Sequence, residues 1–422
     1  MKKLCILLAA LCLLSSCSQR SNTPTRRPDN TPDNFNYTEI KDDPVTGNIV
    51  GFYEDMQYTD GILYFFSEGV LQRLICSTGN VTTVCPDPLC MHDTSACPLY
   101  KVDSYIAAPD GNIYINQQYG DVRLNALGEN IGVDHVAHYA RFDPVSTKKK
   151  VYFSYISEDT DSLSLFISDE VFTDQYRIYK DYMADEKGVW HAALIRMNLE
   201  SGEREFLESY SSGETQGDLI TSVPFSGFLY GDSEKLILLG DDGIYSLSTD
   251  GKSRETILTE IPTSNSYLSD GKNLFYQKSD TLCTIPLSGG EEKVVAENVY
   301  TWNMTENYIY FWTNDEVNLG EIDIKGYLAD ELILYGSTLM RCGHDGSGLT
   351  EVFTFNGDYE NARAGSWLAA GNYVYMTYSK WSDTDGDGVF EDGDEFRSDY
   401  RRATVLLRLD TATGELIEIH AK

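Results

Sequence analysis

The chain has 422 residues, of which 41% are hydrophobic and 12% aromatic, a content typical of a folded protein and not of a disordered one. Its 66 acidic residues outnumber its 33 basic residues, which gives a formal net charge of −33. A surface this acidic repels nucleic acid, so no nucleic-acid partner is expected. It favours cations, cationic partners or simple solubility outside the cell.

The N-terminus has the pattern of an export signal. Met1–Lys3 is basic, and Leu4–Leu14 is apolar and uncharged. Because this apolar segment is too short to cross a bilayer core of about 30 Å, it predicts a signal peptide over residues 1–16. The small residues directly before Cys17 resemble a bacterial lipobox. The resemblance implies cleavage before Cys17, lipid such as palmitate on this residue, and a location on the extracytoplasmic face of the cell membrane. The alternative is an ordinary secretory signal.

Residues 18–44 are polar, rich in Pro, Asn, Asp and Thr, and show no hydrophobic period. This composition predicts that residues 17–44 form a flexible tether which begins at the lipidated cysteine. No second long apolar run follows, so nothing beyond the lipid anchor is expected to enter the bilayer. Residues 45–422 are expected to form one folded domain.

One pattern recurs along this domain. An aromatic-rich strand lies next to an Asp-Gly or similar turn, and two further strands with turn residues follow it. Copies begin near Tyr58, Ala108, Ser168, Leu236, Leu268, Met304 and Ala370. Recurrence every 40 to 60 residues or so, with about four short strands each time, is typical of propeller blades. The sequence therefore predicts an all-β fold, a single β-propeller of seven blades, although six or eight fit the same pattern. Two tandem β-sandwiches are the competing fold.

The repeated segments also resemble a known family. Tyr58–Phe65 and Leu268–Tyr276 are similar to the TolB-like and YWTD-like propeller repeats of bacterial lipoproteins. The resemblance covers nearly everything after residue 45 and implies the fold, but it implies little about activity. We further expect a strand around Ile49–Tyr53 to lie beside Leu416–His420 and to close the ring.

A second motif lies near the C-terminus. Residues 383–394 fit the twelve-residue calcium loop, in which alternating oxygen ligands point at one centre and Gly388 permits a sharp turn. The expected calcium ligands are Asp383, Asp385, Asp387, the Val389 carbonyl, Glu391 and Asp394. Strands expected at Tyr373–Tyr378 and Thr404–Leu409 flank the loop in place of helices, so a structural Ca²⁺ site is predicted. The alternative is a solvated acidic turn.

A third motif combines thiols and an imidazole. Cys85, Cys90, His92 and Cys97 have the number and chemistry of ligands that a tetrahedral Zn²⁺ site needs, although the spacing is not that of a standard zinc finger. The segment resembles a Cys-x-Asp-Pro-x-Cys-x-His segment found in lipoproteins of this kind. The alternatives are a disulfide among these cysteines and Cys76, which an exported protein can form, and catalytic thiol chemistry.

Other candidate residues are less specific. Cys283 and Cys342 lie in predicted strands and are expected to behave as small buried hydrophobic residues. His135 and His138 beside Asp134 could share a cation, and a polar loop explains them as well.

No catalytic motif emerges from the sequence. The grouping of His344, Asp345 and Ser347 is what a turn between propeller strands contains. We therefore expect a membrane-anchored binding or scaffold module for a glycan, a peptide or an envelope protein, and the sequence favours this over an enzyme without deciding between them. The alternative is a propeller enzyme, a glycan lyase or hydrolase. A purely structural partner of another envelope protein, recognised by an apolar patch on the side of the propeller, is a third possibility.

Overall fold

The computed structural model describes the chain from Tyr37 to Ala421 with gaps. The residues outside the description are 1–36, 43, 45–48, 51–55, 68–69, 88–89, 91, 93–96, 109, 125–129, 158–169, 174, 185–189, 212–224, 241–242, 260–263, 265, 315–316, 319–322, 325–326, 329–332, 335–337, 355–361, 384–399 and 422.

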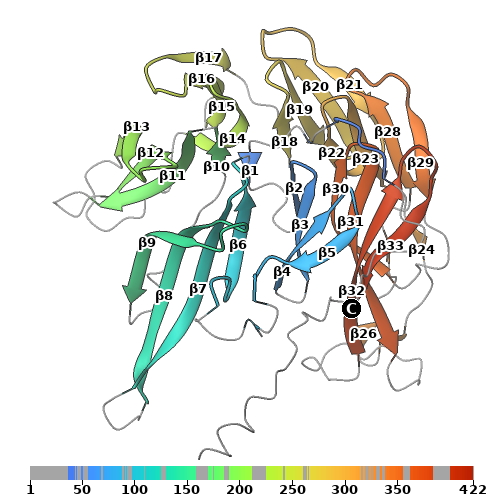
Figure 1. Ribbon diagram of the computed structural model, residues 1–422. Helices are drawn as coiled ribbons and strands as arrows, with labels where there is room; N and C mark the ends of the chain where they lie inside the picture. Colours follow the sequence, from blue (N-terminus) through green and yellow to red (C-terminus); the bar gives the residue numbers. More distant parts are fainter. Residues whose placement is uncertain are drawn as a thin grey trace, which may run out of the picture.

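The described strands form seven antiparallel sheets, and in each sheet the four strands of one blade lie side by side in chain order. The fold is therefore an all-β, seven-bladed propeller (Figure 1). Blades 1 to 4 consist of β2 (Met56–Thr59), β3 (Ile62–Ser67), β4 (Val70–Ile75) and β5 (Asn80–Thr83); β6 (Val102–Ala107), β7 (Ile113–Leu124), β8 (Asn130–Phe142) and β9 (Lys149–Ser157); β10 (Glu170–Phe172), β11 (Tyr176–Ala184), β12 (Trp190–Asn198) and β13 (Arg204–Ser211); and β14 (Phe225–Gly231), β15 (Lys235–Gly240), β16 (Gly243–Ser248) and β17 (Arg254–Leu258).

Blades 5 to 7 complete the ring. Their strands are β18 (Tyr267–Ser269), β19 (Asn273–Lys278), β20 (Thr281–Pro286) and β21 (Lys293–Ala296); β22 (Val299–Met304), β23 (Tyr308–Thr313), β28 (Thr338–Gly343) and β29 (Thr350–Thr354); and β30 (Ala362–Ala370), β31 (Tyr373–Asp383), β32 (Tyr400–Asp410) and β33 (Leu416–Ala421). Blade 6 also carries two short pairs that the sequence did not predict, β24 (Val317–Asn318) with β27 (Ile333–Leu334) and β25 (Asp323–Ile324) with β26 (Tyr327–Leu328).

The recurring Asp-Gly turns explain the tight connection between the first two strands of several blades. Asp60 and Gly61 both have positive φ, 48° and 76°, between β2 and β3. Two successive residues of positive φ are what a two-residue hairpin turn needs to match the right-handed twist of its strands. The alternating apolar residues of the strands then face the neighbouring blade.

Hydrophobic cores lie between the blades. Each of the seven interfaces between described blades holds one cluster of buried side chains. The interface of blades 7 and 1 packs Met56 and Phe65 against Tyr375, Leu406 and Ile419. This packing buries the sheet faces that a single blade would leave exposed, and it joins the first blade to the last.

The predicted pairing of the strand around Ile49–Tyr53 with the last strand of the chain is wrong. β1 (Ile49–Val50) does not lie beside β33; it pairs antiparallel with β10, with Ile49 opposite Val171 and Val50 opposite Glu170. Figure 1 shows β1 next to β10 and apart from β33. The reason is that residues 362–421 already supply all four strands of blade 7. Among the described residues, blades 7 and 1 therefore meet through side-chain contacts and do not share a strand.

Part of the predicted tether lies against the propeller. We call Tyr37–Asp42 together with Pro44 the N-terminal arm. The Tyr37 ring stacks on the Tyr373 ring at 5.5 Å between centroids, and the Thr38 amide donates to the Tyr373 hydroxyl at 2.7 Å. Pro44 forms a bridge with Thr305 of blade 6. The chain therefore contacts blades 6 and 7 at its arm and blade 3 at β1.

The two ends of the ring differ in their connections. Because strands alternate in direction, the first and second strands of every blade are joined at one end, which we call the turn face, and so are the third and fourth. Connections there are short, such as 60–61 and 371–372. The second and third strands, and successive blades, are joined at the opposite end, which we call the loop face. The strand ends that the longest connections join lie at the loop face; these connections are 84–101, 158–169, 212–224, 314–337 and 384–399.

Candidate functional site

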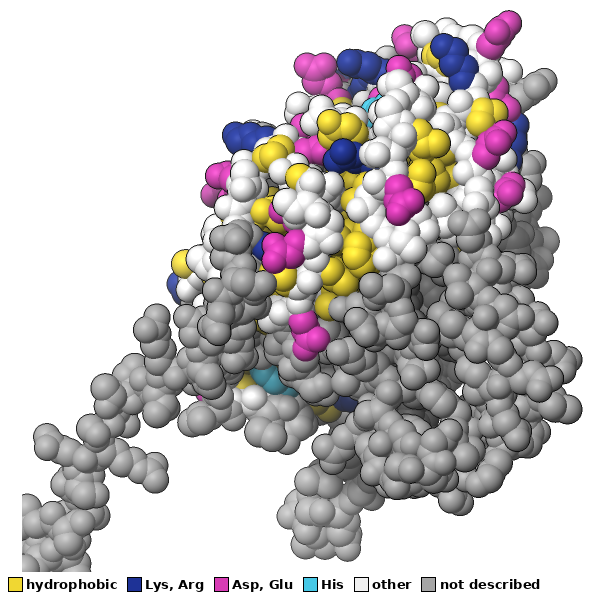
Figure 2. Space-filling view, turned by 90° about the vertical axis from the view of Figure 1, so that its right-hand side faces the viewer, with side chains coloured by type: hydrophobic (Ala, Val, Ile, Leu, Met, Phe, Trp, Pro, Cys, Tyr) yellow, Lys and Arg dark blue, Asp and Glu magenta, His cyan; other side chains and the backbone are white. Residues whose placement is uncertain are grey.

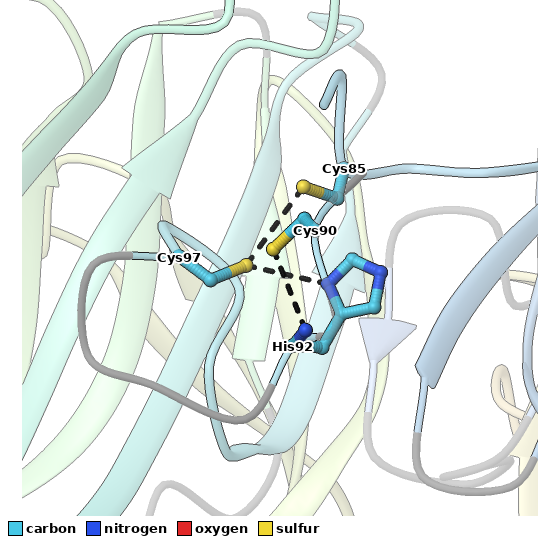
Figure 3. Close-up of side chains that lie close together, drawn as sticks. All are labelled: Cys85, Cys90, His92 and Cys97. Atoms are coloured by element: carbon cyan, nitrogen blue, oxygen red, sulfur yellow. Dashed lines mark hydrogen bonds between the residues drawn. The ribbon is translucent and has the colours of Figure 1, made fainter. Parts of the chain in front are cut away.

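The three cysteines and the histidine of the third motif lie together in the connection from blade 1 to blade 2, on the loop face. Cys85 follows β5 closely, and Cys97 precedes β6. Figure 3 shows the three sulfur atoms and the imidazole gathered around a common centre. Among the described residues, these four form the one group of His, Cys, Asp and Glu side chains close enough to hold a metal ion.

The four potential ligand atoms are close to one another. Cys85 Sγ and Cys97 Sγ are 3.8 Å apart, and His92 Nδ1 is 3.3 Å from Cys97 Sγ. All four ligand atoms, including Cys90 Sγ, lie within 4.8 Å of one another. The residues that the spacing predicted as a set are thus brought together by the fold.

Backbone amides point at two of the sulfur atoms. The His92 amide donates to Cys90 Sγ and the Leu99 amide to Cys97 Sγ, both at 3.4 Å. In each case the donor lies two residues after the cysteine. His92 reaches this geometry with a φ of +57°, in the left-handed region that a non-glycine residue rarely adopts. Such N–H groups stabilise negative charge on sulfur.

The cluster is packed against the core of blades 1 and 2. Cys85 and Cys97 are each 4% exposed and contact the cluster that includes Tyr64, Leu71 and Ile115. Burial raises the pKa of the Cys85 thiol, and it raises the pKa of Cys97 to about 12 although the Leu99 amide opposes the shift. In the absence of a cation these two thiols are therefore neutral at pH 7.

A polar pair on blade 2 holds the end of this loop. The Gln117 amide group is buried on β7 and donates to the carbonyl oxygens of Tyr100 at 2.5 Å and Pro98 at 3.2 Å. Its oxygen accepts a hydrogen bond from Lys149 Nζ on β9. Burial lowers the pKa of Lys149, and the nearby Cys97 acts in the opposite direction. Sequence reasoning missed both residues, because neither belongs to a motif.

The other described cysteines lie apart from this cluster. Cys76, Cys283 and Cys342 are buried in hydrophobic clusters between blades, and all six described cysteines are free thiols. Cys283 and Cys342 lie on the third strands of blades 5 and 6, which confirms that they are small buried residues in equivalent places.

The predicted calcium loop and the predicted lipidation site lie largely outside the described residues. Cys17 and the positions from Asp385 to Asp394 are not described, and Asp383 is the last residue of β31. The predicted flanking strands are confirmed, since β31 and β32 pair over their whole length with Asp383 opposite Tyr400.

His344 has a structural place in the turn between β28 and β29, as its sequence context predicts. Its Nε2 lies 2.9 Å from the Thr305 carbonyl oxygen, and its Nδ1 lies 3.8 Å from Asp270 Oδ2 in blade 5. His138 Nε2 lies 3.1 Å from the Tyr119 hydroxyl within blade 2. The side chains of Asp134 and His135 lie outside the described part of the chain.

A buried ion pair within blade 3 contacts blade 2 through Tyr139. Glu170 and Arg177 are both fully buried and form a two-point salt bridge. The guanidinium carbon lies 3.7 Å from the Tyr139 ring centre and 3.8 Å from that of Tyr179. No pattern in the sequence distinguishes these two charged residues from the many others, so the pair was not predicted.

The side of the propeller that Figure 2 shows carries hydrophobic side chains along its middle, with charged side chains scattered around them. Exposed large hydrophobic residues of blades 5 and 6 include Val294, Tyr308 and Leu349. Among the described residues, no helix has the length and apolar content needed to cross a membrane.

No protein-family profile matches the sequence, and no curated protein matches it. Solved structures with a similar arrangement include oligogalacturonate lyase from Vibrio parahaemolyticus, at 9% identity and a TM-score of 0.41 over 81% of this chain and 88% of that one. Dipeptidyl peptidase 4 from Porphyromonas gingivalis has 9% identity and a TM-score of 0.40 over 88% and 60% of the two chains. The WD40 domain of SCAP from fission yeast has 8% identity and a TM-score of 0.38 over 90% of this chain and 89% of that one. Likenesses of this extent carry no argument about function.

Proposed function

We propose that this protein is a lipid-anchored, extracytoplasmic β-propeller that binds a glycan, a peptide or an envelope protein through its loop face. The observation that carries the proposal is the course of the N-terminal arm. Asp42 and Pro44 lie at the β22–β23 turn of blade 6, and β1 lies along the innermost strand of blade 3. The chain is thus fixed on opposite sides of the ring axis, and its arm occupies the turn face.

The arm also leaves little room at the turn face for another molecule. The Asp42 carbonyl oxygen accepts a hydrogen bond from the Gly371 amide at 2.9 Å. A Cβ atom at Gly371 would lie 2.9 Å from the Ile40 carbonyl oxygen, so the backbone of the arm approaches to a distance that only glycine permits. A ligand that uses an end of the ring is therefore expected at the loop face.

The position of the arm sets how an anchored molecule would be presented. Tyr37, the first described residue, lies on Tyr373 at the turn face. The predicted tether from Cys17 to residue 36 would span about 25 Å on average as a flexible chain. The turn face then lies on the side of the membrane anchor, and the loop face points away from it, toward ligands in the surroundings.

One exposed aromatic side chain on an inner strand, that of Tyr300, supports a glycan or peptide ligand. Tyr300 is 50% exposed and lies at the loop-face end of β22, the innermost strand of blade 6. The strand pairing skips it, with Val299 opposite Thr313 and Thr301 opposite Trp312. A bulge of this kind redirects a side chain and is common beside binding sites. Exposed tyrosine is also favoured in recognition surfaces.

The same blade offers a matched control. Tyr308 is 40% exposed, and it begins β23 at the turn face. The full chain in detergent is tested for retention on isolated peptidoglycan sacculi and on a panel of purified polysaccharides. Tyr300→Ala is expected to weaken binding at least about tenfold, and Tyr308→Ala to leave it unchanged. An equal effect of the two changes, or binding that only Tyr308→Ala impairs, would contradict the assignment of the loop face. Release of soluble sugar by the wild type would favour a glycan-degrading enzyme.

A further inference from the structure

We propose that Cys85, Cys90, His92 and Cys97 bind one Zn²⁺ ion in a closed tetrahedral site that fastens the connection between blades 1 and 2. The proposal is independent of the ligand that the loop face binds. It rests on the placement of four potential ligand atoms within 4.8 Å of one another.

Two of the distances between ligand atoms are close to the edges of a zinc tetrahedron. With Zn–S bonds near 2.3 Å and Zn–N bonds near 2.05 Å, a regular tetrahedron has S···S edges of about 3.8 Å and S···N edges of about 3.6 Å. The structure has 3.8 Å between Cys85 Sγ and Cys97 Sγ and 3.3 Å between Cys97 Sγ and His92 Nδ1.

A disulfide explains the cluster less completely. A disulfide would use two of the three sulfur atoms, and its S–S bond is about 2.05 Å long. The third thiol and the imidazole would then have no role in the bond, although the fold brings both to the same centre (Figure 3). Zinc coordination uses all four groups.

The kind of ligand selects the metal. Thiolate and imidazole groups are preferred by Zn²⁺, whereas Ca²⁺ and Mg²⁺ prefer oxygen. Four ligands from the protein leave no position open for water or substrate, as in structural zinc sites and unlike catalytic ones. The ion would therefore stabilise the loop and would not perform chemistry.

The surroundings of the cluster suit the charge of such a site. Three thiolates, one neutral imidazole and Zn²⁺ together carry one net negative charge. The amides of His92 and Leu99 donate to two of the sulfur atoms. Lys149 lies close enough to Cys97 for electrostatic attraction, and Gln117 holds Lys149 while it binds the Pro98 and Tyr100 carbonyl oxygens. These groups would orient the ligands and offset the remaining charge.

The test combines metal content with the state of the thiols. The full chain is purified in detergent without reductant or chelator, and its metals are measured by elemental analysis. We expect about one zinc per chain, lost in Cys90→Ser and in His92→Ala. Cys283→Ser and Cys342→Ser, which change buried cysteines elsewhere, should keep the zinc. Iron in its place, or zinc that persists in Cys90→Ser and His92→Ala, would overturn the proposal.

The second measurement separates zinc from a disulfide. The wild type is denatured in chelator without reductant, alkylated and digested with trypsin. The peptide between Arg73 and Lys101 contains Cys76 and the three cysteines of the cluster. We expect alkylation at all four positions. A peptide that lacks two alkyl groups and comes from protein without zinc would show a disulfide, and four alkylated thiols without zinc would show a site that binds no metal; each result overturns the proposal.

Discussion

Asp42 and Thr305 are 263 residues apart in the chain and are joined by a buried hydrogen bond of 2.9 Å between the Thr305 hydroxyl and the Asp42 carboxylate. The other carboxylate oxygen of Asp42 accepts hydrogen bonds from the Asn307 amide and the Asn307 side chain, both at 2.9 Å. One side chain of the N-terminal arm thus satisfies the polar groups of a turn in blade 6. The arm is part of the folded propeller.

Removal of this carboxylate should destabilise the protein. Asp42→Ala removes the acceptor of both Asn307 donors and leaves the Thr305 hydroxyl with only the Tyr308 carbonyl oxygen at 3.2 Å, so the free energy of unfolding should fall by about 2–3 kcal/mol. Denaturant unfolding followed by tryptophan fluorescence measures the change. Glu39→Ala alters an exposed acidic residue of the same arm and should stay within about 0.5 kcal/mol of the wild type. Equal stability of the two variants would mean that the arm does not contribute to the fold.

The contact between His344 and Asp270 should make stability depend on pH. Burial lowers the pKa of His344, but the neighbouring Asp270 carboxylate and the Thr305 carbonyl outweigh it and raise the pKa above its ordinary value. Burial raises the pKa of Asp270, but His344 and backbone amides outweigh it and hold the pKa at about 2.

The stabilisation from His344 is therefore complete below its ordinary pKa of 6.5 and is lost as the pH rises through the raised value. The stabilisation from Asp270 is complete above pH 3.8, the ordinary pKa of this group, and is lost as the pH falls toward its lowered pKa of about 2. Between these limits the wild type should exceed His344→Gln in stability by less than about 1 kcal/mol, since the pair is partly exposed. Unfolding curves from pH 5 to 9 test this. A stability advantage of the wild type over His344→Gln that grows as the pH rises would contradict this prediction.

If Cys17 carries the proposed lipid, this one side chain decides the location of the protein. Cys17→Ser should move the protein from the membrane fraction to the soluble extracytoplasmic fraction, because the chain would lose its only predicted anchor. Fractionation followed by immunoblotting measures the change. Ser18→Ala is the neighbouring control and should remain in the membrane. Membrane association that survives Cys17→Ser would refute the anchor.

The calcium loop can be tested separately from the cysteine cluster, because the two sites have different ligands. The double change Asp385→Ala and Asp387→Ala should abolish calcium in the purified protein and leave its zinc unchanged. Elemental analysis measures both metals in one sample. Wild-type protein without calcium would show that residues 383–394 form an acidic turn.

Features set by neighbouring residues could be predicted from the sequence, and features set by distant contacts could not. The Asp60-Gly61 turn and the alternating residues after it predict β2 and β3 locally, and the close spacing of Cys85 to Cys97 predicts the cluster. The pairing of β1 with β10 and the bond from Asp42 to Thr305 depend on which blades meet around the ring. No short sequence pattern records that choice.

Blockage of one face at a time tests most directly whether the loop face binds the ligand. Ser279 and Ser288 are exposed serines of blade 5, in the β19–β20 connection at the loop face and the β20–β21 connection at the turn face. Ser279→Cys and Ser288→Cys are coupled to maleimide-polyethylene glycol, with wild type as the labelling control. Binding to the sacculi or polysaccharide retained by the wild type is then measured. We predict that the polymer on Ser279→Cys abolishes binding while that on Ser288→Cys does not. If only the polymer on Ser288→Cys blocks binding, the ligand binds at the turn face and not at the loop face.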